Sequence, residues 1–317
     1  MQKMSTDPSR HTLDGATMGT RWSAVVITDA AGAETARPAL QKAVDAVDAA
    51  MSTWKDTSDL MRFNRAPAGE WVDLPADLMT VIRRGLEVGR ISGGAFDIGQ
   101  GETVNAWGFG PEAVNTDRIR AALAQPAPPA YEVLELHEDG TRLRKTAPVA
   151  LDLSGIAKGF AVDRMHHILG EMGFGNTLVG LDGELRARGV DADGAPWTVA
   201  VERPDYAARA AYGAVTLQDA AVATSGDYRH WVQVGPKRLA HTMDPQRGGP
   251  LDNGVASTTV MAETCMDADA WATALMVLGP ESGRSLAAGL GLSALMILRE
   301  GDDLCPVGLG PVFAAAA

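Results

Sequence analysis

A carboxylate and a hydroxyl four residues apart are the first candidates for chemistry in this sequence. Asp269 and Thr273 lie in the stretch CMDADAWATAL, whose pattern predicts a helix, so a separation of four places both on one face. Asp267 points elsewhere. Such oxygens are the hard ligands that Mg²⁺ takes, with backbone carbonyls, water and phosphate completing its shell. The alternative is an ordinary helix start, where acidic residues complement the helix dipole and Thr273 merely packs.

A second candidate is the stretch 151–163, LDLSGIAKGFAVD, which has the pattern of a strand, a small-residue turn and a helix reaching about Met172. The predicted strand alternates apolar and polar residues from Val149 to Leu153. Gly155 in the turn would let a phosphate approach the backbone, and the first N–H groups of the helix attract anions. Lys158 opposes the helix dipole, so an anionic partner is expected. The alternative is a solvated lysine.

A third candidate is His241, in AHTMDPQRGGP at the end of a predicted strand. Asp227, in the earlier stretch ATSGDYR, and Asp244 lie near it in sequence. A histidine beside carboxylates can act as a general base. The alternative is a structural histidine at a strand end. Motifs for a serine nucleophile elbow, a P-loop, a zinc protease or a dinucleotide fold are absent from the sequence.

The elements that must position these residues are short strands and a few helices. Strands are predicted at 21–27, 132–136, 141–144, 177–181, 184–187, 196–201, 214–217, 221–224, 230–234, 257–262 and 294–299. Helices are predicted at 34–51, 77–91, 116–123, 266–278 and 281–290. Asp182-Gly183 predicts a hairpin turn. Runs of consecutive strands favour an α+β fold with antiparallel sheet over a regularly alternating one. The glycine-rich stretch 92–110 also holds aromatic residues, which favours an ordered loop over a flexible linker.

Composition narrows the function classes. The 317 residues can form one large core or two domains, and the net charge of −12 argues against a nucleic-acid binder. The sequence has no run of 18 apolar residues, so no membrane span is expected. Cys265 and Cys305 lack metal spacing, so reduced thiols are expected, with a disulfide as the alternative. The polar N-terminus indicates a cytoplasmic protein as written, or a periplasmic one if a signal preceded Met1.

Eight stretches, taken in order, resemble the ApbE-type FAD:protein FMN transferases from about Leu13 to Arg299. They are Met18-Gly19-Thr20, MSTW with SDLMRFN, GGAFD with NAWGFG, DLSGIAKGFAVD, GELRARG, ATSGDYR, H-x-x-DP-x-x-G and DADAWATAL. The resemblance implies a two-lobed α+β sandwich of largely antiparallel sheet with flanking helices and a ligand cleft between the lobes. A single domain would span residues 13–300, between a polar tail at 1–12 and a C-terminal tail at 301–317.

The resemblance also implies an activity and residue roles. Family members use Mg²⁺ to transfer the FMN half of FAD to a threonine hydroxyl of an acceptor flavoprotein, releasing AMP. Asp269, Thr273 and the Gly155 carbonyl would hold the metal. His241, Asp227 and Lys158 would be catalytic, with His241 assisting proton transfer. The residues that would contact FAD are Met18, Trp54, Ala95, Phe96, Asp97, Asp152, Lys158 and Met243.

Elementary chemistry agrees with these roles, because phosphoryl transfer depends on positioning and charge neutralisation more than on covalent help. Trp54 could stack on the flavin, although the family often has tyrosine there. The sequence departs from the family pattern at Asp182, Glu184 and Arg247. Two other activities remain open: an Mg²⁺-dependent FAD pyrophosphatase that gives FMN and AMP, and a non-catalytic FAD-binding maturation factor.

Overall fold

A computed structural model describes residues 9–234, 237–301 and 303–314 of the chain. Its largest feature is an eight-stranded sheet in the order β1-β2-β6-β7-β10-β15-β16-β17, in which every neighbouring pair is antiparallel. The strands are β1 (Ser9–Thr17), β2 (Thr20–Thr28), β6 (Thr177–Leu181), β7 (Glu184–Arg188), β10 (Ala221–Gly226), β15 (Val255–Ala262), β16 (Ser293–Glu300) and β17 (Asp303–Leu309). The sheet is the frame from which the site residues project.

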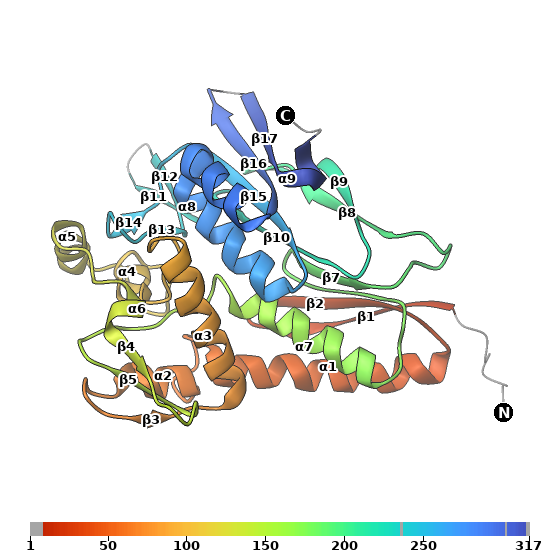
Figure 1. Cartoon of the computed structure of the whole chain (residues 1–317), viewed down its shortest axis with the longest axis horizontal. Coiled ribbons are helices and arrows are strands. Elements are labelled where there is room, and N and C mark those ends of the chain that lie inside the picture. Colours follow the sequence, from red (N-terminus) through yellow and green to blue (C-terminus); the bar gives the residue numbers. More distant parts are fainter. Residues whose placement is uncertain (1–8, 235–236, 302, 315–317) are drawn as a thin grey trace.

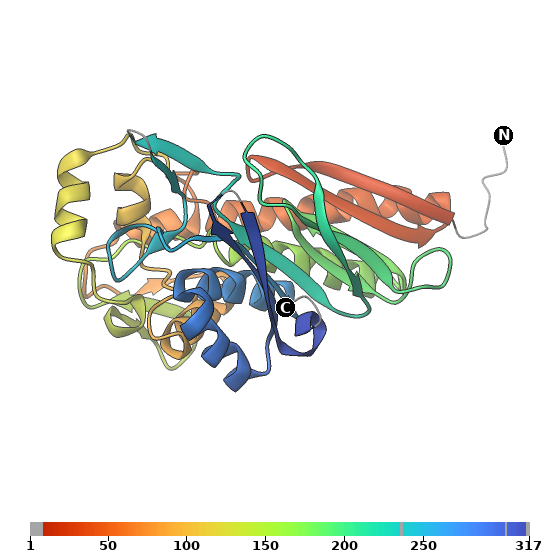
Figure 2. The same ribbon diagram turned by 90° about the horizontal axis from the view of Figure 1, so that it is seen from above.

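Three long helices cover one face of this sheet: α1 (Ala30–Met51), α7 (Ala157–Glu171) and α8 (Cys265–Leu290). Figures 1 and 2 show α1 and α7 running along strands β1 and β2. The helices pack on this face because strand side chains alternate and every second one points toward them. Trp22, Ala24 and Val26 of β2 are buried in the core that the helices share. Helix α1 begins where Asp29 accepts from the Gly32 N–H at 2.7 Å.

The opposite face is covered by the hairpin β8 (Trp197–Glu202) and β9 (Ala211–Leu217), with the short helix α9 (Gly310–Phe313) beside it. Val25 and Ile27, the other half of the β2 alternation, pack against this second core. The core residues contributed by the hairpin are Trp197, Val199, Val201, Val215 and Leu217. The sheet therefore lies between a helical layer and a β-hairpin. This confirms the α+β fold with antiparallel sheet that the strand pattern predicted, and the sandwich that the family resemblance implied.

A second part of the chain, at the left of Figure 1, holds the shorter elements. Its helices are α2 (Asp59–Arg65), α3 (Ala76–Ile91), α4 (Gly101–Ala106), α5 (Thr116–Ala124) and α6 (Ala130–Val133). A small sheet pairs β3 (Val72–Asp73), β5 (Arg142–Lys145) and β4 (Leu134–Leu136). Two further hairpins, β11 (Trp231–Val234) with β12 (Lys237–Ala240) and β13 (Met243–Asp244) with β14 (Gly249–Pro250), lie between the two parts in Figure 1.

The strand predicted at 149–153 does not form, and the reason lies in its hydrogen bonds. Val149, Leu151 and Leu153 are buried as the alternation required. The backbone of Leu151, however, pairs with a side chain: its N–H donates to Asn64 Oδ1 at 2.8 Å and its carbonyl accepts from Asn64 Nδ2 at 2.9 Å. The segment is anchored by an amide side chain and one isolated bridge from Ala150 to Gln100 instead of a ladder.

Two other predictions need correction. Residues 301–317 were expected to be a tail, yet β17 within them pairs with β16 as the edge strand of the main sheet. The expected N-terminal tail at 1–12 overlaps β1, which begins at Ser9. The two helices predicted at 266–278 and 281–290 are confirmed as the two halves of α8, which are separated by a kink at Gly279, where φ is 72° and Pro280 follows. The stretch 92–110 is ordered, as expected, and contains α4.

Helices α7 and α8 cross at a glycine, and this contact sets the geometry of the candidate site. A Cβ atom on Gly159 would lie 2.3 Å from the carbonyl oxygen of Cys265 and 2.9 Å from the Asp269 Cβ. Backbone atoms cannot rotate out of the way as a long side chain can. Only glycine therefore allows the two helices to approach so closely.

We expect Gly159→Ala to lower the free energy of unfolding by about 2–3 kcal/mol, because the added methyl forces the two helices apart. Gly289→Ala is the matched control in α8, since a Cβ there meets no atom within 4 Å. It should instead stabilise the protein by about 0.5 kcal/mol through helix propensity. Urea unfolding of both variants measures the difference, and equal midpoints would contradict the crossing described here.

Candidate active site

A carboxylate of the protein itself, that of Asp269, binds the first turn of α7. The Gly159 N–H donates to Oδ2 of Asp269 at 3.0 Å, and Asp269 is buried. The N-cap position of α7 is Ile156, which offers no side-chain acceptor. The carboxylate of Asp269 thus satisfies one of the free N–H groups and complements the helix dipole. Part of the anion-binding capacity predicted for this turn is therefore already used.

The orientation of Asp269 follows from how α8 begins. Asp163 of α7 accepts from the backbone N–H groups of Cys265 and Met266, both at 2.9 Å, and Arg186 holds Asp163 at 2.6 Å. These bonds fix the start of α8 against α7. Asp267 turns the other way and pairs with Arg84 at 2.5 Å, as its helical position predicted. Asp269 is consequently directed at α7.

One turn further along α8, Thr273 meets the turn before α7. Its Oγ1 lies 2.9 Å from Oγ of Ser225 at the end of β10. A Cβ placed on Gly155 would lie 3.2 Å from the same Oγ1 and 3.3 Å from the ring of Phe96. Gly155 is therefore held between a hydroxyl and an aromatic ring. The structure brings together Gly155, Thr273 and Phe96, three residues that the resemblance implied, and adds Ser225.

A buried charge cluster surrounds Lys158. Its ammonium lies 2.6 Å from Oε1 of Glu184 and 3.6 Å from Oδ2 of Asp182. Burial lowers the pKa of Lys158, but the charges of Glu184, Asp269 and Asp182 outweigh it and raise that pKa overall. Burial, and then the charge of Glu184, raise the pKa of Asp269 to about 7. Lys158 is thus a partner of carboxylates within the protein, where a ligand phosphate had been expected.

The donors in this cluster fit a hard divalent cation. Asp269 supplies a carboxylate whose charge is only partly compensated, and Thr273 supplies a neutral hydroxyl one turn away. Gly155, which lies against Thr273, would add its backbone carbonyl. Ionised Asp182, Glu184 and Asp269 with Lys158 carry two net negative charges, which one divalent ion would balance. Within the described ranges, no three His, Cys, Asp or Glu residues form a metal cluster, so the shell would rest on this single carboxylate.

Two tight turns lie next to the charge cluster. Met18, with φ of 47°, and Gly19 join β1 to β2, and Asp182, with φ of 54°, and Gly183 join β6 to β7. Asp182 therefore occupies the left-handed region that a two-residue hairpin requires, as its sequence pattern predicted. The hydroxyl of Thr20 donates to Oδ1 of Asp182 at 3.2 Å, which ties the two turns together. The turn that contains Met18 is thereby tied to the turn that carries Asp182.

The residues 95–97 form a buried corner rather than an open wall. Ala95 and Phe96 are each 4% exposed. The carboxylate of Asp97 accepts from the backbone N–H groups of Gly99 and Ala130 and from the Gln100 side chain. Burial raises the pKa of Asp97. Among these three, Phe96 is the one that reaches Gly155, so the proposed FAD contact of Asp97 stays a prediction.

Three further residues implied for FAD contact lie in different settings. Trp54 is 67% exposed just after α1, so its ring is open to a partner. Asp152 accepts from the N–H of Ser154 at 2.8 Å and also from its hydroxyl, which shapes the turn before α7. Met243 is buried in β13. Within the described part of the chain, neither Trp54 nor Met243 forms a hydrogen bond with a residue of the charge cluster.

His241 follows β12 and is held by its neighbours. Its ring lies against those of His230 and Phe109, with centroids 5.4 and 6.4 Å away, and its Nδ1 lies 3.2 Å from the His230 carbonyl oxygen. That carbonyl can only accept, so the tautomer with a proton on Nδ1 is assigned and Nε2 is left as a base. Burial, and then the charges of His230 and Lys158, lower the pKa of His241 to about 4. The imidazole is therefore neutral near pH 7.

Asp227 is not free to serve as a base. Its carboxylate pairs with Arg299 at 2.8 Å and accepts from the hydroxyl of Tyr206 at 3.0 Å. Nearness in sequence to His241 suggested a catalytic carboxylate, but the side chain is engaged elsewhere, so its catalytic role stays a prediction. Cys265 and Cys305 are unpaired thiols, as expected. None of the described helices has the length and apolar character that crossing a bilayer requires.

Sequence reasoning missed Ser225 and the contribution of Glu184. Ser225 lies in ATSGDYR, a stretch that was singled out, but the alternation of β10 alone does not show that its hydroxyl meets α8. Glu184 is 2% exposed, and its Oε2 is buried without a partner among the described residues. A glutamate directly after a hairpin turn looks solvent-exposed in sequence. The signal that could have revealed it is Lys158, a half-buried cation at a helix start that required an anionic partner.

Comparison with known proteins agrees with the family resemblance seen in the sequence. A model of the "ApbE family" matches residues 18–296. A relative from Klebsiella pneumoniae (strain 342), named FAD:protein FMN transferase, is 37% identical over 296 residues, covering 92% of this chain and 85% of the relative. A solved structure of the flavin transferase ApbE from Vibrio cholerae is 34% identical with a TM-score of 0.85, covering 95% of this chain and 97% of that one.

The flavinyl transferase ApbE of Pseudomonas stutzeri is also 34% identical, with a TM-score of 0.83 and coverage of 95% of each chain. The antiparallel α+β architecture is thus shared with solved structures as well as with named relatives. A family model and relatives of this identity over almost the whole chain leave one assignment: the chain belongs to the ApbE family.

Proposed function

We propose that this protein transfers the FMN moiety of FAD to a threonine hydroxyl of an acceptor flavoprotein, with release of AMP, in a reaction that depends on Mg²⁺. The observation that carries the proposal is the convergence of Asp269, Thr273 and Gly155 at the start of α7, where the charge of Lys158 acts on Asp269. Relatives at 34–37% identity are named for this transfer. In the transfer, a bond forms between the threonine oxygen and the FMN phosphorus, and the bond from that phosphorus to the AMP oxygen breaks.

Asp269, Thr273 and the Gly155 carbonyl would hold Mg²⁺. When bound, the ion neutralises the pyrophosphate charge that increases as AMP departs. Glu184 and Asp182 keep Lys158 charged. Its ammonium would therefore add positive potential near the pyrophosphate oxygens. His241 can take the threonine proton on Nε2, because its pKa near 4 leaves the imidazole unprotonated at neutral pH.

The flavin end would lie against Met18 and the open ring of Trp54. An aromatic side chain that is 67% exposed can stack on a planar ligand at little conformational cost. Ala95, Phe96, Asp97, Asp152 and Met243 are proposed to shape the rest of the FAD pocket. Of these, Phe96 has direct support from its contact with Gly155.

Incubation of the protein with FAD, Mg²⁺ and a candidate flavoprotein should esterify FMN to one threonine of that flavoprotein. Intact-protein and peptide mass spectrometry detect the addition, and substitution of that threonine by alanine should abolish it. Free FMN and AMP without any modified acceptor would instead identify an FAD pyrophosphatase. Bound FAD that is never cleaved would identify a binding protein.

Asp269→Asn should reduce the rate of FMN transfer by about 10²-fold or more, because it removes the charged member of the proposed cation site. Asp267→Asn is the matched control two residues earlier in α8. Its carboxylate pairs with Arg84 away from the site, so activity should stay within about two-fold and stability within about 1 kcal/mol. Equal losses in both variants would point to a folding defect and contradict the assignment.

The pH dependence of stability provides an independent test. The folded-state pKa of Asp269 is about 7 and its usual value is 3.8, so the folded protein retains a proton that the unfolded chain has lost. Without divalent cations, stability should therefore decline as the pH rises from about 4 to about 7. Added Mg²⁺ should restore stability most strongly at and above pH 7. Thermal unfolding at several pH values measures both trends, and Asp269→Asn should remove them.

A further inference from the structure

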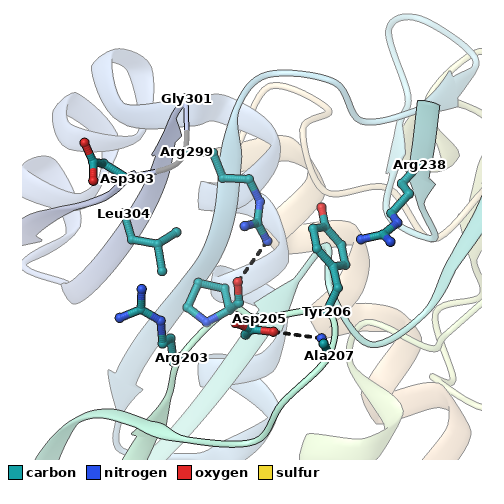
Figure 3. A pocket seen from close by; sticks show the side chains of 10 residues that line it. Arg203, Asp205, Tyr206, Ala207, Arg238, Arg299, Gly301, Asp303 and Leu304 are labelled. Carbon is teal, nitrogen blue, oxygen red and sulfur yellow. Dashed lines mark hydrogen bonds between the residues drawn. The ribbon is translucent and has the colours of Figure 1, made fainter. Parts of the chain in front are cut away.

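An open pocket of about 350 Å³ lies beside a second cavity of about 180 Å³. The larger pocket is walled by the loop after β8, by β12 and by the turn between β16 and β17 (Figure 3). Tyr206, Arg238 and Arg299 line both cavities. None of the roles assigned above to the FAD and cation site uses this pocket.

The two cavities adjoin the candidate active site through the chain itself. Ala240 lines the smaller cavity and directly precedes His241. Asp227, also in its wall, lies two residues after Ser225, whose hydroxyl is 2.9 Å from that of Thr273. A molecule anchored in this pocket would therefore lie next to the segments that carry the proposed base and the proposed cation ligands.

Most charges around the pocket are already satisfied. Arg299 is bound to Asp227 and also donates to the Pro204 carbonyl at 3.0 Å. Asp205 accepts from the backbone N–H groups of Ala207 and Ala208, and these bonds lower its pKa. Figure 3 shows Asp303 on the far side of the pocket from Tyr206.

Two arginines of the pocket wall, Arg203 and Arg238, make no ion pair within the residues described, and Arg238 is the one held by aromatic rings. Its guanidinium lies over the rings of Tyr206 and Trp231, at 4.4 and 4.7 Å from their centroids. Stacking occupies the flat faces of a guanidinium and leaves the N–H groups at its edge available. Arg238 is therefore a pre-oriented cation at the mouth of a pocket, and no ion pair with a described residue occupies its donors.

We propose that Arg238, held by Tyr206 and Trp231, is a docking subsite for an acidic side chain of the acceptor polypeptide. The inference rests on the proposed transfer to a protein. The anionic groups of FAD already have proposed partners around Lys158, so the other substrate is the one that needs a site. An aspartate or glutamate carboxylate matches the edge of a guanidinium through two parallel hydrogen bonds. The net charge of −12 repels acidic chains in general, so such a partner needs a local cation.

Peptide binding to the whole enzyme in the presence of FAD tests this subsite. The probes are fluorescein-labelled peptides with a central threonine in a glycine-serine background, in which one aspartate is moved through the flanking positions. Each has an asparagine counterpart. By fluorescence anisotropy, at least one aspartate peptide should bind about ten-fold more tightly than its counterpart. Arg238→Gln should remove that preference. Arg209→Gln should retain it, because Arg209 is an exposed arginine of the loop after β8 that lies outside the pocket.

The proposal is overturned if every aspartate and asparagine pair binds alike, or if Arg238→Gln keeps the preference. Inorganic phosphate that binds the enzyme through Arg238 without any aspartate preference would identify a pocket for free anions, which also overturns it. Binding is measured without turnover. Loss of FMN transfer together with an intact aspartate preference would therefore refute the proposed reaction and leave the subsite in place.

Discussion

The hydrogen bond between the Gly159 N–H and Asp269 is the interaction on which the rest of the site depends. It requires two helices to cross so closely that residue 159 has no room for a Cβ. It also buries a carboxylate at a helix N-terminus, where the dipole and the free N–H groups lower the cost of burial. Once this contact is made, the position of Thr273 one turn later and its approach to Gly155 follow from helix geometry.

The remaining site residues are brought to this crossing by hairpins and strand ends. The β1–β2 and β6–β7 turns present Met18 and Asp182, and Thr20 joins them. Strand β10 carries Ser225 next to its last residue, and the residue after β12 is His241. These elements come from well-separated parts of the sequence, yet each contributes one or two side chains. Antiparallel sheets allow this, because the ends of alternate strands meet at the same edge.

The sequence predicted local structure well and long-range contacts unevenly. Periodicity located most helices and strands, and the spacing of Asp269 and Thr273 identified a real face of α8. Periodicity failed at 149–153. The apolar side chains there are buried as predicted, but the backbone of Leu151 hydrogen-bonds to Asn64, which lies far away in sequence, and not to a neighbouring strand. Lys158 was correctly given an anionic partner, but the partners are Glu184 and Asp182. Burial pattern does not show which of several available anions a lysine meets.

Asp227 shows why proximity in sequence is a weak guide to chemistry. It follows Ser225 closely and precedes His241, but the strand direction turns its carboxylate toward Arg299 and Tyr206. Its oxygens already accept hydrogen bonds from a guanidinium and a phenol, so the carboxylate is poorly placed to act as a general base. Its contribution is to hold Arg299 and Tyr206 in place, and Tyr206 in turn supports Arg238. Thr273 of the site and Arg238 of the pocket are thus linked through the two ends of one short segment, Ser225 to Asp227.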